Sequence, residues 1–258
     1  MLLLAALLLA AAPQRVVSMA PSLTDLMVEL GAADRLVGVS RFDAEPELAA
    51  VPRVGGLYDP SLEAVVRLHP DLVLGLDGVA FAPSLQALRA AKLEVLPLRT
   101  DTLDEIRDSL RALGARLAIA GRAEKTWGEL AQLIAKLRVA SQGRPRVRCA
   151  VAVDFRPLVL AGRGSYLEPL IEAAGGENVS TSELAWPTSS VEQLMASKVE
   201  VLIDGGAAEE DAASLRLLEL LRARGTRVVR LPNGDLFQPG PRAIRALPDL
   251  AEALHASP

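Results

Sequence analysis

The chain has 258 residues, which is enough for one large domain or two of moderate size. Half of its residues are hydrophobic and 23% are charged, and this composition excludes an intrinsically disordered chain. The net charge of −4 gives no basic surface of the kind that nucleic acids require, so we expect no nucleic-acid partner.

The chain begins with an apolar segment, Met1 to Ala12, made almost entirely of leucine and alanine. It is too short to cross a bilayer, but it fits the apolar core of a secretory signal that ends in small residues. An apolar first strand is the alternative interpretation. We therefore expect residues 1–12 to be a signal segment and the protein to be exported.

Strands and helices alternate over the next ninety or so residues. The pattern predicts strands at 15–19, 36–39, 72–74 and 93–96, and helices at 23–30 and 84–91. Such alternation is typical of a mostly parallel sheet with helices on both faces. It predicts an α/β lobe that covers residues 13–120.

The pattern then changes to helix from Thr102 to Ala140, and Gly121 is predicted to break it. The second stretch, residues 121–142, is long enough at about 1.5 Å per residue to be a connector helix that resists bending. Alternation restarts afterwards and predicts a C-terminal lobe at residues 143–258. Its expected elements are strands near 151–153 and 227–231 and helices at 165–174, 211–224 and 242–255.

Two stretches of the chain read as copies of each other. Ser61 to Leu74 and Ser190 to Ile203 each begin with a polar residue and continue through a short helix into a buried strand. Glu192 lies 129 positions after Glu63 (192 − 63). A unit that recurs once at this spacing is too long for a solenoid repeat. It predicts two similar lobes with mostly parallel sheets, and a ligand held in a cleft between them.

Six of the eight aromatic residues lie at predicted strand ends or helix starts. In parallel α/β sheets, ligands bind beyond the carboxyl ends of the strands. We therefore expect a flat, largely apolar ligand, although loop aromatics can also simply cover the edge of a lobe. These six residues are Phe42, Tyr58, Phe81, Phe155, Trp186 and Phe237, while Trp127 and Tyr166 are interpreted as packing residues.

No motif in the sequence indicates catalysis or a metal site. The single cysteine, Cys149, cannot form an internal disulfide and is interpreted as a buried strand residue. His69 and His255 have no nucleophile at a recognisable spacing, and the segment 162–165 lacks the further glycine and the lysine of a phosphate loop. We expect no catalytic residue, no metal ligand, no resident cofactor and no enzymatic activity.

Motifs spread over nearly the whole chain after Ala12 resemble one family, the periplasmic substrate-binding proteins with a helical backbone. These proteins serve ABC importers of cobalamin, haem and ferric siderophores. The resemblance implies a monomer in the periplasm that delivers its ligand to a permease dimer. The motifs are Arg15-Val16-Val17-Ser18, Val37-Gly38-Val39-Ser40, Val54-Gly55-Gly56, Pro60-Ser61-Leu62-Glu63, Pro70-Asp71-Leu72-Val73, Gly175-Gly176-Glu177-Asn178, Ala185-Trp186-Pro187 and Ser190-Val191-Glu192.

Within the family the chain is most similar to the cobalamin-binding members. In these, an aromatic residue after the second strand and a Trp-Pro pair of the second lobe contact the corrinoid, and Phe42 and Trp186 match them. The chain departs at Leu57, Leu76 and Leu236, where those members have aromatic residues, so the ligand stays open. The implied ligand-binding residues are Phe42, Leu57, Tyr58, Phe155, Trp186, Asp235, Leu236, Phe237, Gln238 and Pro239.

Glu63 and Glu192 match the family's docking carboxylates, which meet arginines on the two permease subunits. A glutamate in the first turn of a helix also interacts favourably with the helix dipole, and Ser189-x-x-Glu192 fits a capping box. That local explanation does not account for the recurrence of the same residue in both copies, which favours docking.

Two other ligand classes remain open. Tyr58 lies in a loop of the first lobe where a tyrosinate could hold haem iron. A ferric siderophore, which is often anionic, would need cationic side chains. The candidates are Arg41, Arg156, Arg163 and Arg242.

Overall fold

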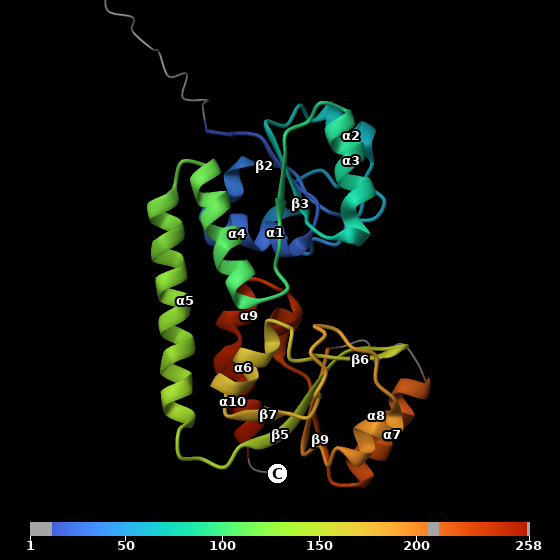
Figure 1. Ribbon diagram of the computed structural model, residues 1–258. Coiled ribbons are helices and arrows are strands. Elements are labelled where there is room, and N and C mark those ends of the chain that lie inside the picture. Colours follow the sequence, from blue (N-terminus) through green and yellow to red (C-terminus); the bar gives the residue numbers. More distant parts are fainter. Residues whose placement is uncertain (1–11, 206–211, 257–258) are drawn as a thin grey trace, which may run out of the picture. The chain divides into compact units, whose positions relative to one another are not determined.

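The computed structural model describes residues 12–205 and 212–256 (Figure 1), so the expected signal segment lies outside the described residues except for Ala12. The chain divides into two compact units. The N-terminal unit comprises the residues up to Pro97 together with Arg111–Glu124, and the C-terminal unit comprises Leu98–Leu110 and the residues from Lys125 onward. Segment 98–110, expected in the N-terminal lobe, joins the C-terminal unit, where the Tyr166 N–H donates to the Asp101 carbonyl at 2.6 Å.

The N-terminal unit contains a four-stranded sheet in the order β2-β1-β3-β4. Strand β1 pairs in parallel with both β2 and β3. The expected α/β alternation is confirmed, although β4 begins two residues later than predicted. The strands are β1 (Val16–Ser18), β2 (Leu36–Gly38), β3 (Leu72–Leu76) and β4 (Val95–Leu98), and the helices are α1 (Pro21–Glu29), α2 (Leu62–Arg67) and α3 (Ala82–Ala90) with the short 3-10 turns η1 (Ala33–Arg35), η2 (Pro46–Leu48) and η3 (Val79–Phe81).

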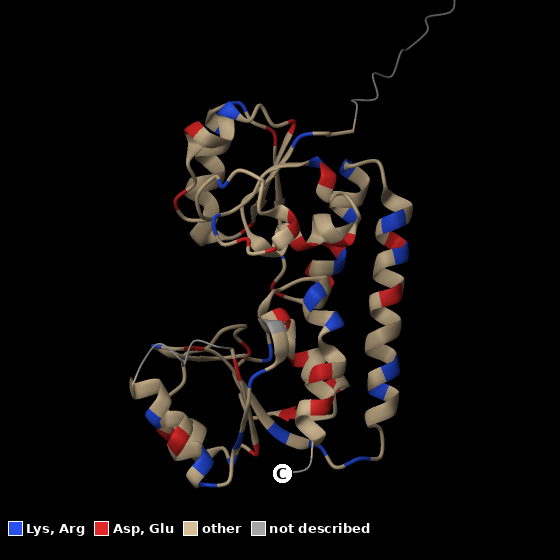
Figure 2. Cartoon of the chain, turned by 180° about the vertical axis from the view of Figure 1, so that it is seen from behind, with Lys and Arg blue, Asp and Glu red and all other residues tan. Residues whose placement is uncertain are grey.

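Two long helices follow, α4 (Leu103–Arg116) and α5 (Ala120–Ser141), and each contributes residues to both units. Figure 2 shows basic and acidic residues interspersed along α5. The predicted break at Gly121 is wrong, because that glycine lies in the first turn of α5. The chain instead turns at Ala118, which has φ 58°, and the Ile119 N–H donates to the Gly114 carbonyl at 2.7 Å. This bond closes α4 as a Schellman motif with alanine in place of the usual glycine.

The C-terminal unit contains a five-stranded sheet in the order β6-β5-β8-β9, with β7 also paired to β5. Strand β5 is parallel to β7 and β8 and antiparallel to β6. The strands are β5 (Val147–Phe155), β6 (Leu158–Leu160), β7 (Gly176–Asn178), β8 (Val201–Asp204) and β9 (Arg227–Val229), and the helices are α6 (Leu167–Ala173), α7 (Val191–Ala196), α8 (Ala212–Ala223), α9 (Pro241–Arg245) and α10 (Leu247–His255), with the 3-10 turn η5 (Pro232–Phe237).

Three local features of this unit differ from the expectation. Strands β6 and β7 were not predicted, and the single closing helix at 242–255 is two helices. Pro248, in the first turn of α10, explains the division, because proline has no N–H to continue the hydrogen bonds of α9. The predicted helix at 211–224 is confirmed from Ala212 onward, and its first residue lies outside the described residues.

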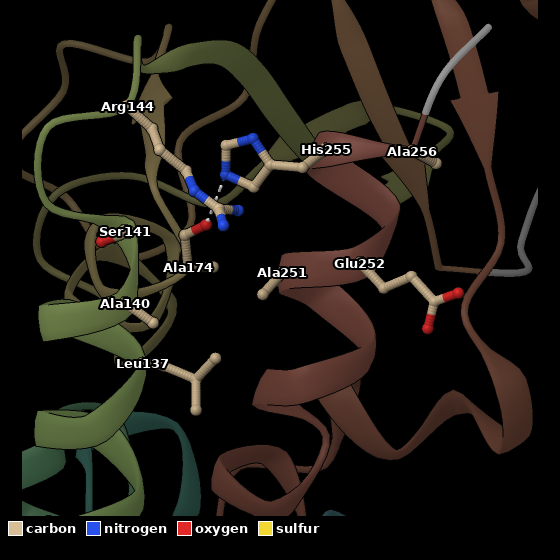
Figure 3. Close-up of a pocket in the computed structure, with 9 residues that line it drawn as sticks. All are labelled: Leu137, Ala140, Ser141, Arg144, Ala174, Ala251, Glu252, His255 and Ala256. Carbon is tan, nitrogen blue, oxygen red and sulfur yellow. Dashed lines mark hydrogen bonds between the residues drawn. The ribbon is translucent and has the colours of Figure 1, made fainter.

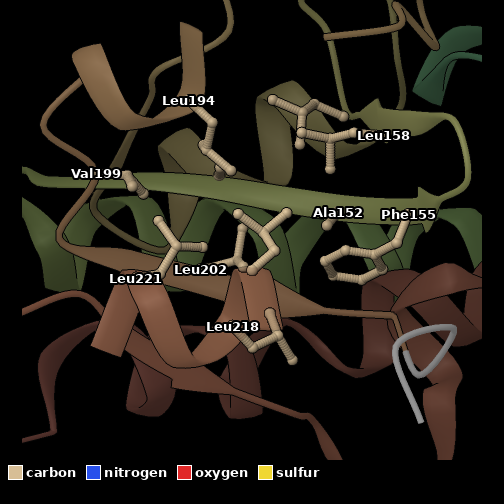
Figure 4. Packing of buried hydrophobic residues seen from close by; sticks show 11 residues of the cluster. Ala152, Phe155, Leu158, Leu194, Val199, Leu202, Leu218 and Leu221 are labelled. Atoms are coloured by element: carbon tan, nitrogen blue, oxygen red, sulfur yellow. The ribbon is translucent and has the colours of Figure 1, made fainter. Parts of the chain in front are cut away.

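The core of the C-terminal unit is built from β5 and β8 and the helices α7 and α8 (Figure 4). Ala152, Leu202, Leu218 and Leu221 are among its buried residues. Cys149 is buried in β5, as expected. Within residues 12–205 and 212–256, no helix combines the length and the apolar character needed to cross a membrane.

The copied stretches are alike in their hydrogen bonds as well as in their sequence. Helices α2 and α7 have six residues each, and the side chains of Ser61 and Ser190 cap their N-termini. Each helix is followed by a residue with positive φ, His69 at 45° and Lys198 at 54°. The duplication predicted from the sequence therefore extends to the backbone.

An arginine closes each copy in the same way. The Arg15 N–H donates to the Asp71 carboxylate at 3.0 Å, and the Arg148 N–H donates to the Glu200 carboxylate at 2.7 Å. The two guanidinium groups donate to carbonyls at the ends of α2 and α7, Leu68 O at 2.6 Å and Ser197 O at 2.7 Å. These bonds satisfy acceptors that a helix C-terminus leaves open.

Candidate functional site

Three aromatic residues of the N-terminal unit lie outside its sheet with rings that are exposed or half-buried, and together they are called here the aromatic patch: Phe42, Tyr58 and Phe81. Phe42 is 63% exposed and Tyr58 is 70% exposed. The rings of Tyr58 and Phe81 lie 5.3 Å apart between centroids, at an angle of 45°. Exposed rings in a unit with an aliphatic core mark a surface suited to binding an apolar partner.

Arg41 and Gly56 hold Phe42 in its place. The Arg41 guanidinium lies 5.3 Å from the centre of the Phe42 ring and forms an ion pair with Asp59. That hydrogen-bonded arginine lowers the pKa of Asp59 below its usual value. A Cβ at Gly56 would approach Arg41 to 2.9 Å and the Phe42 ring to 3.0 Å, so the ring packs over a position that only glycine fits without displacement.

Tyr166 contacts two of the predicted site residues of the C-terminal unit, Trp186 and Leu236. Its ring meets the half-buried Trp186 edge-on at 5.7 Å, and its hydroxyl donates to the Leu236 carbonyl at 2.9 Å. Phe237 packs beside Gly205, where a Cβ would come within 3.0 Å of its ring. Burial raises the pKa of Tyr166 and keeps its hydroxyl a donor. Tyr166 is a packing residue, as expected, but no sequence pattern predicted that it links Trp186 to the segment at 235–239.

Two predicted ligand-binding residues do not lie on the surface. Phe155 is 8% exposed and packs in the core with Leu158 and Leu218 (Figure 4), so its expected place at a rim is wrong. The side chain of Leu236 is also fully buried. Both residues are turned inward because the β5–β6 pair and the η5 turn close over the core.

The remaining predicted residues are partly accessible. Leu57 packs against the core of the N-terminal unit, and Asp235 lies 3.9 Å from the Arg242 guanidinium. Gln238 and Pro239 are half-buried. Three of the arginines considered for an anionic ligand already face carboxylates: Arg41 faces Asp59, Arg163 faces Glu183 and Arg242 faces Asp235.

Glu63 and Glu192, which the sequence predicts as docking residues, differ in their surroundings. Glu63 is 82% exposed and forms an ion pair with Arg67 one turn later in α2. The capping box of α7 is formed by Ser190 and Gln193 rather than by Ser189 and Glu192, so the predicted local role of Glu192 is wrong. Its own backbone N–H and the Ser190 side chain lower the pKa of Glu192. Both side chains are accessible to solvent.

The C-terminal unit also holds a cavity of about 350 Å³ between the end of α5 and α10 (Figure 3). Leu137, Ala140 and Ala251 line its apolar part, and the His255 ring lies beside it with Nε2 3.1 Å from the Ala174 carbonyl. None of the predicted site residues lines this cavity. Among the described residues, no group of three His, Cys, Asp or Glu side chains could hold a metal ion.

Comparison with known proteins settles the family. Residues 16–218 match the family model described as "Periplasmic binding protein". The chain belongs to this family. Its members are substrate-binding components of ABC importers rather than enzymes.

Among curated relatives, the chain is 30% identical over 251 residues to the vitamin B12-binding protein of Salmonella typhi, with 95% of this chain and 91% of that protein covered. It is 29% identical over 252 residues to the protein of the same name from Pectobacterium carotovorum, covering 95% and 90%. Among solved structures, the periplasmic vitamin B12 binding protein of Vibrio cholerae has a TM-score of 0.77 at 25% identity, covering 94% and 97%. A periplasmic heme binding protein from Pseudomonas aeruginosa has a TM-score of 0.77 at 28% identity, covering 95% and 94%.

Proposed function

We propose that the protein captures cobalamin or a related corrinoid in the periplasm and delivers it, chemically unchanged, to the permease of an ABC importer. The observation that carries this proposal is the aromatic patch, whose Phe42 and Tyr58 rings are mostly exposed to solvent. A corrin macrocycle is broad and largely apolar on its faces. Burying one phenylalanine-sized side chain against such a face contributes about 1.5–3 kcal/mol to binding. The relatives named as vitamin B12-binding proteins support the same ligand class.

The test is a titration of the purified protein with cyanocobalamin and with hemin, side by side. We expect saturable binding of one equivalent of cyanocobalamin, measured by calorimetry and by the shift of the corrin absorbance. Binding of hemin but not of cyanocobalamin would show that the ligand is haem rather than a corrinoid. Binding of neither would reject the proposal.

Haem is the second candidate, and Tyr58 favours it. Its phenol is exposed and stacks on Phe81, so its oxygen is accessible to an iron atom. The named haem-binding neighbour has the same fold at 28% identity. If haem is the ligand, Tyr58→Phe removes the oxygen that would hold the iron, and the Soret band of bound haem should be lost. If a corrinoid is the ligand, this variant should keep most of its affinity.

A ferric siderophore is the third candidate and the least favoured of the three. An anionic chelate needs available cations, and Arg41, Arg163 and Arg242 each lie against a carboxylate of this chain. Competition of a ferric siderophore against cyanocobalamin measures this alternative directly.

The proposed partner is a permease dimer that receives Glu63 and Glu192 on its two subunits. Both carboxylates stand in the first turns of matching helices. Exposed charges of this kind act mostly on the association rate and on the orientation of docking. A transport assay with reconstituted permease tests this part of the proposal.

A further inference from the structure

Phe42 sits in a tight turn whose next residue points inward. Ser40 organises the turn, because its Oγ accepts from the Phe42 N–H at 3.0 Å and its carbonyl accepts from the Asp43 N–H at 3.2 Å. The Phe42 ring is exposed, whereas Asp43 is only 4% exposed. The two neighbouring side chains therefore leave the turn on opposite sides, with Phe42 toward solvent and Asp43 toward the interior.

The Asp43 carboxyl is buried, and its neighbours offset that burial only in part: interactions with the Thr24 hydroxyl and the Ser40 backbone lower its pKa, but burial outweighs them. Neither Oδ1 nor Oδ2 has a hydrogen-bond partner. The Thr24 hydroxyl of α1 lies close to it, but the hydrogen bonds of that hydroxyl run to Ser18 Oγ at 2.8 Å and to the Ala20 carbonyl at 3.3 Å. An ionised carboxylate in such a place is unfavourable, and a neutral carboxyl is tolerated.

Two charged residues near the same turn act on this carboxyl in opposite directions. Glu45 disfavours ionisation, and Arg53 favours it. The Arg53 guanidinium, however, donates to the carbonyls of Leu48 at 3.0 Å and Val51 at 3.2 Å and makes no hydrogen bond to Asp43. Burial dominates and raises the pKa of Asp43 to about 6.

We propose that Asp43 is a positioning residue for Phe42. The protonated Asp43 side chain stays packed beneath the Ser40–Asp43 turn and fixes the Phe42 ring, whereas its ionisation loosens the turn. Ligand capture at the aromatic patch is thereby linked to the binding of a proton by Asp43. The folded state binds this proton more tightly than the unfolded chain does. The stabilisation is therefore complete at acidic pH and is lost as the pH rises through about 6. The effect of the turn on ligand binding rests on the proposed function, whereas the effect of Asp43 on the position of the Phe42 ring is independent of it.

The first experiment needs no ligand. The Asp43 carboxyl ¹³C signal and the Phe42 ring signals are followed by NMR between about pH 4.5 and 8.5. We expect both to shift with one midpoint near pH 6, and we expect the Phe42 signals to become independent of pH in Asp43→Asn. Asp34→Asn, which removes an exposed carboxyl of the same unit, should titrate as the wild type does. Phe42 signals that do not shift, or that shift unchanged in Asp43→Asn, overturn the inference; Asp43→Ala replaces that variant if it does not fold.

The second experiment measures the dissociation constant for cyanocobalamin at pH 5 and pH 8. The wild type should bind roughly three- to tenfold more tightly at pH 5, and Asp43→Asn should bind equally at both pH values, near the wild-type affinity at pH 5. Equal pH profiles in the two proteins contradict the inference. Absence of cyanocobalamin binding at every pH rejects the corrinoid proposal instead, and the NMR titration still decides the role of Asp43.

Discussion

Arg15 and Arg148 make the same hydrogen bonds in the two units. Comparing the units shows which features the two copied stretches share and which differ. Both arginines donate to a carbonyl at the end of a six-residue helix, and both receive an acidic partner, Asp71 or Glu200, on their backbone N–H. The guanidinium bonds satisfy carbonyls that the C-terminus of a helix leaves without an intrahelical partner. The features shared by the two units are those that the backbone requires.

The surfaces of the two units have diverged. The N-terminal unit presents Phe42 and Tyr58 to solvent, whereas Phe155 and Tyr166 of the C-terminal unit are buried. Trp186 and Phe237 of the C-terminal unit are half-buried, and Tyr166 packs edge-on against the Trp186 ring. The predicted rings are therefore mostly exposed in one unit and packed against buried residues in the other.

The largest expected effect tests the buried side of this comparison. Phe155→Ala removes a core ring and should lower the free energy of unfolding by about 3–5 kcal/mol, measured by urea denaturation. Phe42→Ala, at an exposed position, should change it by less than about 0.5 kcal/mol. Equal small effects in the two variants would show that Phe155 does not contribute to the core.

The next effect concerns ligand affinity. Phe42→Ala and Trp186→Ala should each weaken cyanocobalamin binding by roughly 10- to 100-fold, because each loses the area that a ring covers. Calorimetric titration measures the change, and the fold is checked by circular dichroism. Val79→Ala, at a fully exposed apolar position of the N-terminal unit, is the matched control and should bind normally. Unchanged affinity in both ring variants would reject the aromatic contacts.

Docking should show a smaller, unequal effect. Glu192→Ala should reduce ligand-dependent stimulation of the permease more than Glu63→Ala, because Glu63 is already paired with Arg67 while Ala196 stands at the matching position of α7. The double variant should impair docking most and leave cyanocobalamin affinity unchanged. Normal transport with the double variant would disprove the docking role.

The smallest effect belongs to Arg67. Arg67→Ala removes the competing cation and should raise the association rate with the permease about twofold at low salt, since exposed pairs of this kind are weak. Stopped-flow association at two salt concentrations measures it, with Arg89→Ala as the control at another exposed arginine of the same unit. A slower rate in Arg67→Ala would mean that Arg67 itself contacts the permease.

Sequence patterns predicted most elements within a few residues, because apolar periodicity and capping residues act over one or two turns. They failed where the decisive residues carry no distinctive local signal. Ala118 rather than Gly121 ends α4, since a bond from Ile119 to Gly114 closes the helix there. Strands as short as β6 and β7 exist only because β5 pairs with them, and their own residues carry too little signal.

The amino-acid sequence by itself determined the α/β alternation, the paired Ser-x-Glu units and the family, because these depend on local spacing. Only the tertiary structure decided which rings face water, since Phe42 and Phe155 both follow a predicted strand and are distinguished by what packs over them. It also placed the Asp43 carboxyl in a buried position next to Phe42, where its oxygens lack close hydrogen-bond partners. Burial is the sum of contacts from distant segments, so the accessibility and charge of a side chain depend on the folded neighbours around it.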